Sequence, residues 1–294
     1  MTMKKISRRF FIKKSFIYIT TIICSLVGGR YYMKDIEPSW VDITNFTYSH
    51  PLIPESFDNI RIIQFSDTHL GFQYNLSDLE ETIETIQTPN PDIICFTGDL
   101  MDNPNDYQET SEIITLLSKL KAPLGKYGVY GNHDHGGYGT EIYKDIMSNS
   151  GFSLLVNESN FITLGDGSRI VISGVDDAML GKPNLDSSFP KQPDELFTIL
   201  LSHAPDYADY ASRYPFGLQL SGHSHGGQIQ IPLLGAVVTP PFAEKYREGA
   251  YTIDSLTLYV NRGLGTTRIP YRLFSRPEIT VIDLQHGQEG LKKL

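Results

Sequence analysis

The sequence has few cysteines, and no acidic residue occurs in its first 34 positions. Two cysteines among 294 residues exclude a small fold held together by disulfides. Cys95 lies in the apolar run 93–96 and is expected to be a buried core residue rather than a nucleophile. Glycine (25) and proline (17) are near average usage, which excludes collagen-like and low-complexity chains. With 40% apolar residues the chain can bury a sizeable core, so disorder is excluded as its main state.

Charge is unevenly distributed along the chain. Residues 1–34 contain eight Lys and Arg and no acid, whereas residues 35–294 contain 17 Lys and Arg against 34 Asp and Glu, a net charge of −17. A body this acidic repels a polynucleotide unless it contains a local basic groove. We therefore expect no nucleic-acid partner, and membrane contact only through residues 1–34.

The basic N-terminus resembles a twin-arginine export signal, in which paired arginines precede apolar residues and a lysine. Arg8 and Arg9 precede an apolar triplet and Lys13, and an uncharged, mainly apolar run follows from Ser15 to Gly29. Fifteen residues are short for a membrane span of about 20 residues and suit the apolar region of a signal better. An uncleaved anchor with the body outside, or an ordinary basic N-terminus before an anchor, remains an alternative. The expected partner is the twin-arginine translocation machinery, and the expected location is the extracellular face, the cell wall or the membrane.

From residue 60 onward, short apolar runs of strand length alternate with helical periods, and the later part is mostly strand-like. About ten strands exceed one comfortable twisted sheet, so we predict one α/β domain with two sheets. Ser77 and Glu80 have the spacing of a capping box, and Asp166-Gly167 is typical of a hairpin. The predicted helices are residues 77–87, 109–121, 140–148 and 206–214. The predicted organisation is a signal or anchor (1–34), a leader (35–54), the domain (55–284) and a frayed tail (285–294).

Polar motifs follow five of the predicted strands, at the points where the strands end. They are Ser66-Asp67-Thr68-His69, Gly98-Asp99, Gly131-Asn132-His133-Asp134, Ser202-His203 and Gly222-His223-Ser224-His225. Each motif alone is more often a turn or a cap. The carboxyl ends of strands form the ligand crevice of α/β folds, however, so the five loops can converge. Six of the eight histidines lie in these loops, and the joint occurrence predicts one site.

The residue types in these loops suit divalent metal ions. Carboxylate and amide oxygens with imidazole nitrogens are ligands for Mn, Fe, Zn or Co, and the absence of thiolate argues against a structural zinc site. Two metals about 3.5–4 Å apart can activate water and neutralise the attacking and leaving oxygens of a phosphate ester. Such a pair needs a bridging carboxylate, because two adjacent dications repel each other.

In this order, the five motifs resemble the calcineurin-like metallophosphoesterase superfamily over about residues 55–284. Residues 222–228 and 261–265 are similar to its YkuE-type branch of exported envelope phosphoesterases. The resemblance implies a two-sheet β-sandwich flanked by helices, a four-layer α/β/β/α fold. It also implies that Asp99 bridges two divalent metal ions. The other implied ligands are Asp67, His69 and His225 for the first metal, and Asn132, His203 and His223 for the second. His133 would protonate the leaving alkoxide or stabilise the transition state, and Asp134 would orient His133.

Four further residues are weaker candidates for substrate contact: Arg262, Arg268, Arg272 and His135. Arginine can pair with phosphate oxygens through its two-pronged guanidinium, but pairing with surface acids or capping strand ends is an equal alternative. For His135 in its Gly-rich loop, solvent exposure is the favoured alternative. Two other pairs stay open: Asp176 and Asp177 as crevice residues or turn formers, and Phe242 and Tyr246 as a specificity wall or packing.

The expected function is that of an exported phosphoesterase with two divalent metal ions, in which metal-activated hydroxide attacks phosphorus in line. A phosphodiester or a pyrophosphate is favoured as the substrate over a monoester. One alternative is a catalytically silent envelope-binding module, which would have no need for His133 as a positioned acid. Another is a cytoplasmic nuclease, which the basic N-terminus and the acidic body disfavour.

Overall fold

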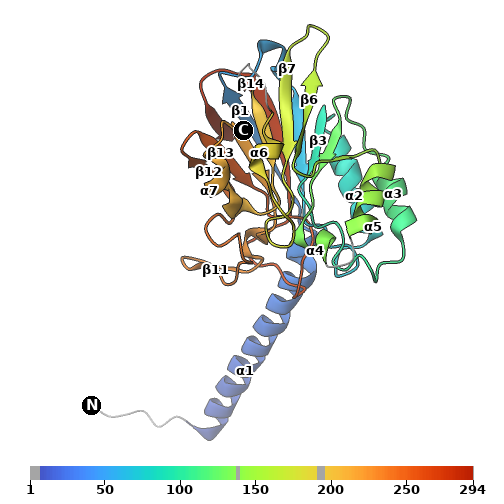
Figure 1. The fold of residues 1–294 in the computed structure, drawn as a ribbon. Coiled ribbons are helices and arrows are strands. Elements are labelled where there is room, and N and C mark those ends of the chain that lie inside the picture. The colour runs from blue at the N-terminus through green and yellow to red at the C-terminus, as the bar shows by residue number, and fades with distance from the viewer. Residues whose placement is uncertain (1–6, 137–139, 191–195, 294) are drawn as a thin grey trace.

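The computed structural model describes residues 7–136, 140–190 and 196–293. Two mixed sheets lie face to face, helices cover their outer faces, and one long helix, α1, extends away from the domain (Figure 1). This arrangement confirms the predicted α/β class and the four-layer sandwich. Residues 1–6 of the predicted signal and Leu294 of the predicted tail lie outside the described residues.

The first sheet has seven strands and the second has six. The first is ordered β15 (Gly290–Lys293), β1 (Asp42–His50), β14 (Glu278–His286), β2 (Arg61–Phe65), β3 (Ile93–Phe96), β4 (Lys126–Gly128) and β5 (Ser153–Leu154). The second is ordered β12 (Gly249–Ile253), β13 (Leu256–Val260), β9 (Leu218–Ser221), β8 (Thr198–Leu201), β7 (Arg169–Gly174) and β6 (Glu158–Thr163). A small separate hairpin pairs β10 (Gln230–Ile231) with β11 (Gly235–Ala236).

Helices are longest at the N-terminus and against the first sheet. The α-helices are α1 (Arg8–Tyr31), α2 (Leu76–Gln87), α3 (Thr110–Leu117), α4 (Asn132–His135), α5 (Thr140–Asn149), α6 (Leu185–Ser188) and α7 (Ala208–Ala211). A π-helical turn, η1 (Tyr32–Ile36), continues α1, and short 3₁₀ turns are η2 (Glu37–Ser39), η3 (Glu55–Phe57), η4 (Pro205–Tyr207) and η5 (His225–Gly227). The predicted helix at 109–121 is therefore shorter than expected, and the one at 206–214 is divided between η4 and α7.

Side chains that alternate between the two faces of each buried strand explain how the helices and the second sheet both pack against the first sheet. In β2, Ile63 and Phe65 pack against α2, α3 and α5, whereas Ile62 faces the second sheet. Successive side chains of a strand point to opposite faces, so a strand buried on both faces is continuously apolar. Cys95 belongs to the core between the sheets and is fully buried, as predicted.

Parallel pairing brings the polar motifs to one end of the molecule. In the first sheet β2, β3 and β4 run parallel, and in the second β7, β8 and β9 do. The five motifs follow β2, β3, β4, β8 and β9, and the carboxyl ends of these strands lie toward the end of the domain from which α1 leaves (Figure 1).

The predicted domain boundaries need correction at both ends. Strand β1 lies within the predicted leader, yet it pairs with β14 over nine residues, from Asp42 with Glu278 to His50 with His286. The predicted frayed tail instead forms β15, which pairs antiparallel with β1. Both strands find their partners far away in the sequence, and local composition does not show such pairing.

Of the two local sequence motifs, the predicted hairpin turn is confirmed and the predicted capping box is wrong. The Asp166-Gly167 hairpin is confirmed, because it connects β6 and β7. The capping box of α2 is formed by Asn75 and Asp78 rather than by the predicted Ser77 and Glu80. The Asn75 side chain accepts hydrogen bonds from the first turn, and Asp78 accepts one from the Asn75 amide. The helix therefore begins one residue earlier than predicted.

Candidate metal centre

The first predicted ligand group comes together in the structure. Ligand atoms of Asp67, His69 and His225 lie within 4.8 Å of one another, and all three residues are buried. His69 Nε2 lies 3.1 Å from His225 Nε2, and His225 Nε2 lies 3.6 Å from Asp67 Oδ1. The loop after β2 in the first sheet and the loop after β9 in the second thus place two nitrogens and an oxygen around one point.

The second group lies beside the first and shares Asp99 with it. Asp99, His203 and His223 form another buried set with ligand atoms within 4.8 Å. Asp99 Oδ2 lies 3.3 Å from His203 Nε2 of this set and 3.5 Å from His69 Nε2 of the first. One carboxylate oxygen therefore faces both groups, which is the position that a bridging ligand occupies.

Unpartnered buried atoms indicate that these groups suit metal ions. Among the described residues, Asn132 Oδ1 and His203 Nε2 are buried without a hydrogen-bond partner. Buried polar atoms are rarely left unpaired, because the lost hydration is costly. Oxygen and imidazole donors without thiolate fit Mn, Fe, Zn or Co. The residues present therefore fit a divalent metal, and their individual ligand roles remain predictions.

In His203 and His223, one ring nitrogen donates a hydrogen bond to a backbone carbonyl, which leaves the other ring nitrogen available to a metal ion. His203 Nδ1 donates to the Thr97 carbonyl at 2.6 Å, which leaves Nε2 to face the centre. His223 Nε2 donates to the Pro241 carbonyl at 2.8 Å, so its Nδ1 is free. Burial, His69 and the Arg272 guanidinium lower the pKa of His225 well below its usual range, which keeps that ring neutral.

The backbone is left-handed at five of the seven predicted ligands. Positive φ angles occur at Asp67 (52°), His69 (46°), Asp99 (60°), His223 (67°) and His225 (50°). For residues other than glycine each such conformation costs of the order of 1 kcal/mol and is common at functional sites. A Cβ at Gly131 would clash with the Asp99 carboxylate, and one at Gly222 would clash with Ser66 and Asp67. Only glycine lets these loops approach the carboxylates so closely.

His133 lies beside the first group without belonging to it. Its backbone amide donates to Asp99 Oδ1 at 2.8 Å, and its ring packs edge-on against His69 with centroids 4.5 Å apart. Nδ1 donates to the Asp102 carbonyl at 2.7 Å, which leaves Nε2 free to exchange a proton. Burial lowers the pKa of His133, but Asp99 and Asp102 outweigh burial and the net shift is upward.

The predicted role of Asp134 is wrong. Its carboxylate accepts hydrogen bonds from the backbone amides of Asp99 (2.7 Å), Leu100 (3.0 Å) and Gly131 (2.9 Å), and so it does not orient the His133 ring. Asp134 is completely buried and ties the loop after β3 to the loop after β4. It is a positioning residue for Asp99.

Asp102 is the residue that the sequence interpretation missed. Its Oδ1 lies 3.2 Å from His69 Nδ1 and 3.7 Å from His133 Nδ1, and the three residues form a further group of possible ligands. Its place three residues after Asp99, in the same loop, was the available signal. Asp102 supports both rings from the side opposite the metal groups.

The three candidate arginines have different surroundings. Arg272 is fully buried and donates to the carbonyls of residues 262, 263, 265 and 275, so a substrate does not reach it and its predicted role is wrong. Arg262 pairs with Asp42 at 3.1 Å and with Glu278 at 3.5 Å, as the alternative interpretation expected. Arg268 is exposed and has a φ of 63°. Its contact with substrate stays a prediction.

The remaining candidates are mostly structural. His135 Nε2 pairs with Asp176 Oδ1 at 2.6 Å, so the predicted solvent-exposed histidine is instead half-buried and paired. Asp177 accepts hydrogen bonds from the amides of Met179 and Leu180, which is a turn-forming role. Tyr246 packs in the core outside the second sheet, whereas Phe242 is 38% exposed.

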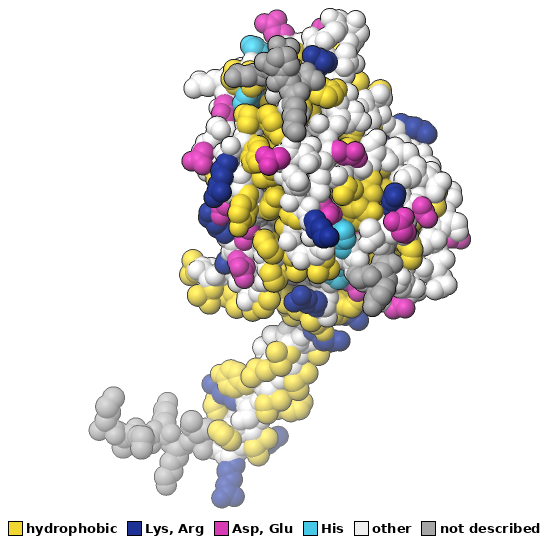
Figure 2. Space-filling view, in the orientation of Figure 1, with side chains coloured by type: hydrophobic (Ala, Val, Ile, Leu, Met, Phe, Trp, Pro, Cys, Tyr) yellow, Lys and Arg dark blue, Asp and Glu magenta, His cyan; other side chains and the backbone are white. Residues whose placement is uncertain are grey.

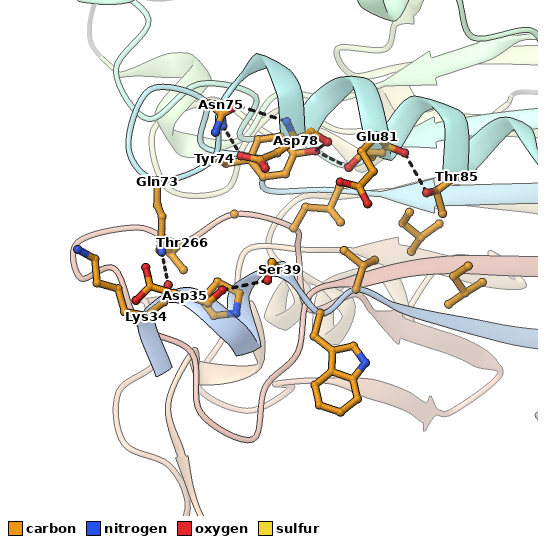
Figure 3. Close-up of a pocket in the computed structure, with 18 residues that line it drawn as sticks. Lys34, Asp35, Ser39, Gln73, Tyr74, Asn75, Asp78, Glu81, Thr85 and Thr266 are labelled. Atoms are coloured by element: carbon orange, nitrogen blue, oxygen red, sulfur yellow. Dashed lines mark hydrogen bonds between the residues drawn. The ribbon is translucent and has the colours of Figure 1, made fainter. Parts of the chain in front are cut away.

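A cavity of about 570 Å³ lies between α2 and the chain that follows α1 (Figure 3). Among the described residues, its lining contains none of the seven predicted ligands. Gln73 connects its walls, because it accepts a hydrogen bond from Thr266 at 2.8 Å and donates one to the Lys34 carbonyl. The cavity is therefore separate from the metal groups and borders the attachment of α1.

The fold and the paired ligand groups define a metal-dependent phosphoric ester hydrolase. The chain belongs to the calcineurin-like phosphoesterase family, whose model matches residues 60–227. It is 48% identical to the Bacillus subtilis metallophosphoesterase YkuE over 96% of this chain and 99% of that protein.

Two more distant relatives have names that state a reaction. The chain is 27% identical to the UDP-2,3-diacylglucosamine pyrophosphatase LpxG of Chlamydia muridarum, over 91% of this chain and 96% of that protein. It is 26% identical to the Escherichia coli phosphodiesterase YaeI, over 92% of this chain and 98% of that protein.

Proposed function

We propose that this chain uses two divalent metal ions to hydrolyse a phosphodiester or a pyrophosphate outside the cytoplasmic membrane. The observation that carries the proposal is the position of Asp99 Oδ2 between the two ligand groups. Two bound ions supply Lewis acidity and an activated water nucleophile. The relatives named as a phosphodiesterase and a pyrophosphatase support this choice of substrate class.

The chain's own residues supply the remaining parts of the reaction. His133 Nε2 is free while its Nδ1 is held by the Asp102 carbonyl, so the ring can deliver a proton to the leaving oxygen. Asp134 fixes the backbone of Asp99, and Asp67 accepts the His223 amide with both oxygens at 3.0 and 3.1 Å. A silent binding module would have no use for a histidine held in this way.

Metal removal tests the proposed reaction. Dialysis of the full chain against a chelator is expected to abolish hydrolysis of bis-p-nitrophenyl phosphate and of a nucleotide-sugar diphosphate, because the two ligand groups then hold no cation. Mn, Fe, Zn or Co added singly should restore it, and p-nitrophenyl phosphate should be a poorer substrate throughout. Metal content by mass spectrometry and release of product are measured together. A chain that binds two ions yet hydrolyses none of the three substrates would instead be the silent module.

Export through the twin-arginine route is the second part of the proposal. Arg8 and Arg9 lie at the start of α1, directly after its N-cap Ser7. Replacing both with Lys is expected to leave folded, active protein in the cytoplasm, because the receptor recognises the arginine pair rather than its charge. Cell fractionation with an activity assay measures this. Lys13→Arg with Lys14→Arg, which keeps the arginine pair and the charge, is the control and should be exported. Normal export of the variant that lacks both arginines would indicate a general secretory signal.

A further inference from the structure

The small hairpin formed by residues 230–238 exposes an unusual amount of apolar surface. Leu233 is fully exposed, and Leu234 (78%), Val238 (65%) and Val237 (56%) follow closely. Figure 2 shows hydrophobic side chains gathered over β11, near the point where α1 leaves the domain. Contiguous apolar surface on a protein marks an interaction site more often than scattered exposed residues do.

Hydrogen bonds connect the base of this hairpin, through residues 272 and 273, to the turn η1 that continues α1. The amide of Gln230 donates to the Leu273 carbonyl at 2.8 Å, and the amide of Leu273 donates to the Gln228 carbonyl at 3.0 Å. The neighbouring Arg272 amide donates to the carbonyl of Met33 at 2.8 Å. The hairpin and α1 thus leave the domain at the same end (Figure 1). Two exposed apolar residues, Ile269 (45%) and Phe274 (61%), lie on either side of residues 272 and 273, which make these contacts.

Helix α1 is long and apolar enough to cross a bilayer. Its 24 residues extend about 36 Å at 1.5 Å per residue, against a hydrocarbon core of about 30 Å. The helical stretch Arg8–Ser39 contains an 18-residue window of mean hydropathy 1.6, and none of that window is buried against the domain. The uncharged run 15–29 is continued at both ends by further helical residues, so the helix is longer than this run alone. The lysine and arginine side chains among these flanking residues can reach the lipid headgroups.

Two exposed aromatic residues near the C-terminal end of α1 are of the types found at membrane surfaces. Tyr31 is 59% exposed and Trp40 is 49% exposed, and both tyrosine and tryptophan concentrate at membrane–water interfaces. The π-helical turn η1 lies between them, and buried Glu37 accepts a hydrogen bond from the Ser275 amide at 2.8 Å. The domain is therefore held against the outer end of α1 rather than on a free linker.

Three exposed arginines lie around the hairpin, although the body is strongly acidic and Gln230 at the base of the hairpin donates a hydrogen bond to Glu248. Arg247 is exposed, and its Nη1 lies 3.6 Å from where a Cβ on Gly235 would be. Arg268, next to Ile269, and Arg30, at the end of α1, are exposed as well. Apolar side chains bordered by cations match a layer in which lipid phosphates lie above hydrocarbon.

We propose that residues 230–238, together with Ile269 and Phe274, insert into the interfacial layer of the bilayer that α1 spans. The carboxyl ends of β2, β3 and β4, and with them the metal centre, then face the lipid headgroups. This inference departs from the expectation that membrane contact is confined to residues 1–34. It rests on a membrane-embedded α1 but not on the proposed hydrolysis, so a fluorescence measurement tests it independently of activity.

The test uses single labelled cysteines in the full chain. Cys24→Ser removes the exposed thiol, and Cys95 is buried. Leu234→Cys is labelled with an environment-sensitive nitrobenzoxadiazole dye, and the chain is reconstituted into equimolar phosphatidylcholine and phosphatidylglycerol vesicles. Gly165→Cys is the matched control, because Gly165 lies in the β6–β7 turn at the opposite end of the domain with open space around it. The Leu234 label should show a blue shift and quenching by doxyl-labelled lipid, and the Gly165 label neither.

Each other outcome contradicts the proposal. Equal emission from the two labels, without quenching by doxyl lipid, would leave the hairpin in water. A blue shift that grows with protein density and resists doxyl quenching would show that a second copy of the chain covers the hairpin. Val238→Cys repeats the measurement on the other arm of the hairpin if Leu234→Cys does not fold.

Discussion

Asp99→Asn is expected to abolish hydrolysis and to lower the metal content below two ions per chain. Asp99 Oδ2 lies 3.3 Å from His203 Nε2 and 3.5 Å from His69 Nε2, so one negative charge serves both ligand groups. Asparagine has the same size but no charge, so the repulsion between two dications is left uncompensated. Elemental analysis of the purified variant gives the metal content, and the rate on bis-p-nitrophenyl phosphate gives the activity.

Asp206→Asn is the matched control for Asp99→Asn. The Asp206 carboxylate also holds backbone amides, those of Glu244, Lys245 and Tyr246, but it lies outside both ligand groups. This control is expected to keep two metals and its normal rate. Circular dichroism shows whether each variant folds. Two metals and near-normal turnover in Asp99→Asn would overturn the assignment of Asp99 as the bridge.

His133→Ala should lower the rate by about 10²–10⁴-fold, the usual contribution of a general acid or base, while two metals stay bound. The ring packs against His69 and is held through Nδ1, yet it belongs to neither of the two metal groups. The loss should be largest for substrates that leave as a poorly stabilised alkoxide. It should be smallest for p-nitrophenolate, which needs no proton to depart. Rates on two diesters that differ only in the leaving alcohol provide the measurement.

His135→Ala is the control for this second experiment. His135 is two residues away and pairs with Asp176 instead of facing His69. It should keep both its metals and most of its rate. Loss of metal from His133→Ala would make His133 a ligand, and an equal loss on both diesters would remove its role as the acid.

The ligand motifs could be predicted from the sequence because each lies directly after a buried strand. β2, β3 and β8 are largely apolar runs of strand length, β9 is a buried strand that alternates leucine with polar residues, and parallel pairing brings their ends together. Predicting that these strand ends lie together does not require knowing where any side chain in the loops points. Residue type and strand order were sufficient to predict which loops meet.

Side-chain direction within the loops could not be predicted in the same way. Asp134 adjoins His133 in the sequence, yet it accepts amides from the neighbouring loop. Arg272 was a weak candidate for substrate contact, yet backbone carbonyls surround it. In both cases the hydrogen-bond partners are backbone groups of other segments. Every residue has such groups, so the residue types in the sequence do not show where these partners lie. The same reason applies to β1 and β15.

The position of β1 between β14 and β15 determines when the chain can finish folding. This strand is made well before its two partners, which lie within residues 278–293. The first sheet therefore stays open at one edge until residues 278–293 have been made, and pairing between such distant segments is slow to form. A route that carries folded proteins, as proposed here, must accept this chain after residues 278–293 have been made and paired with β1.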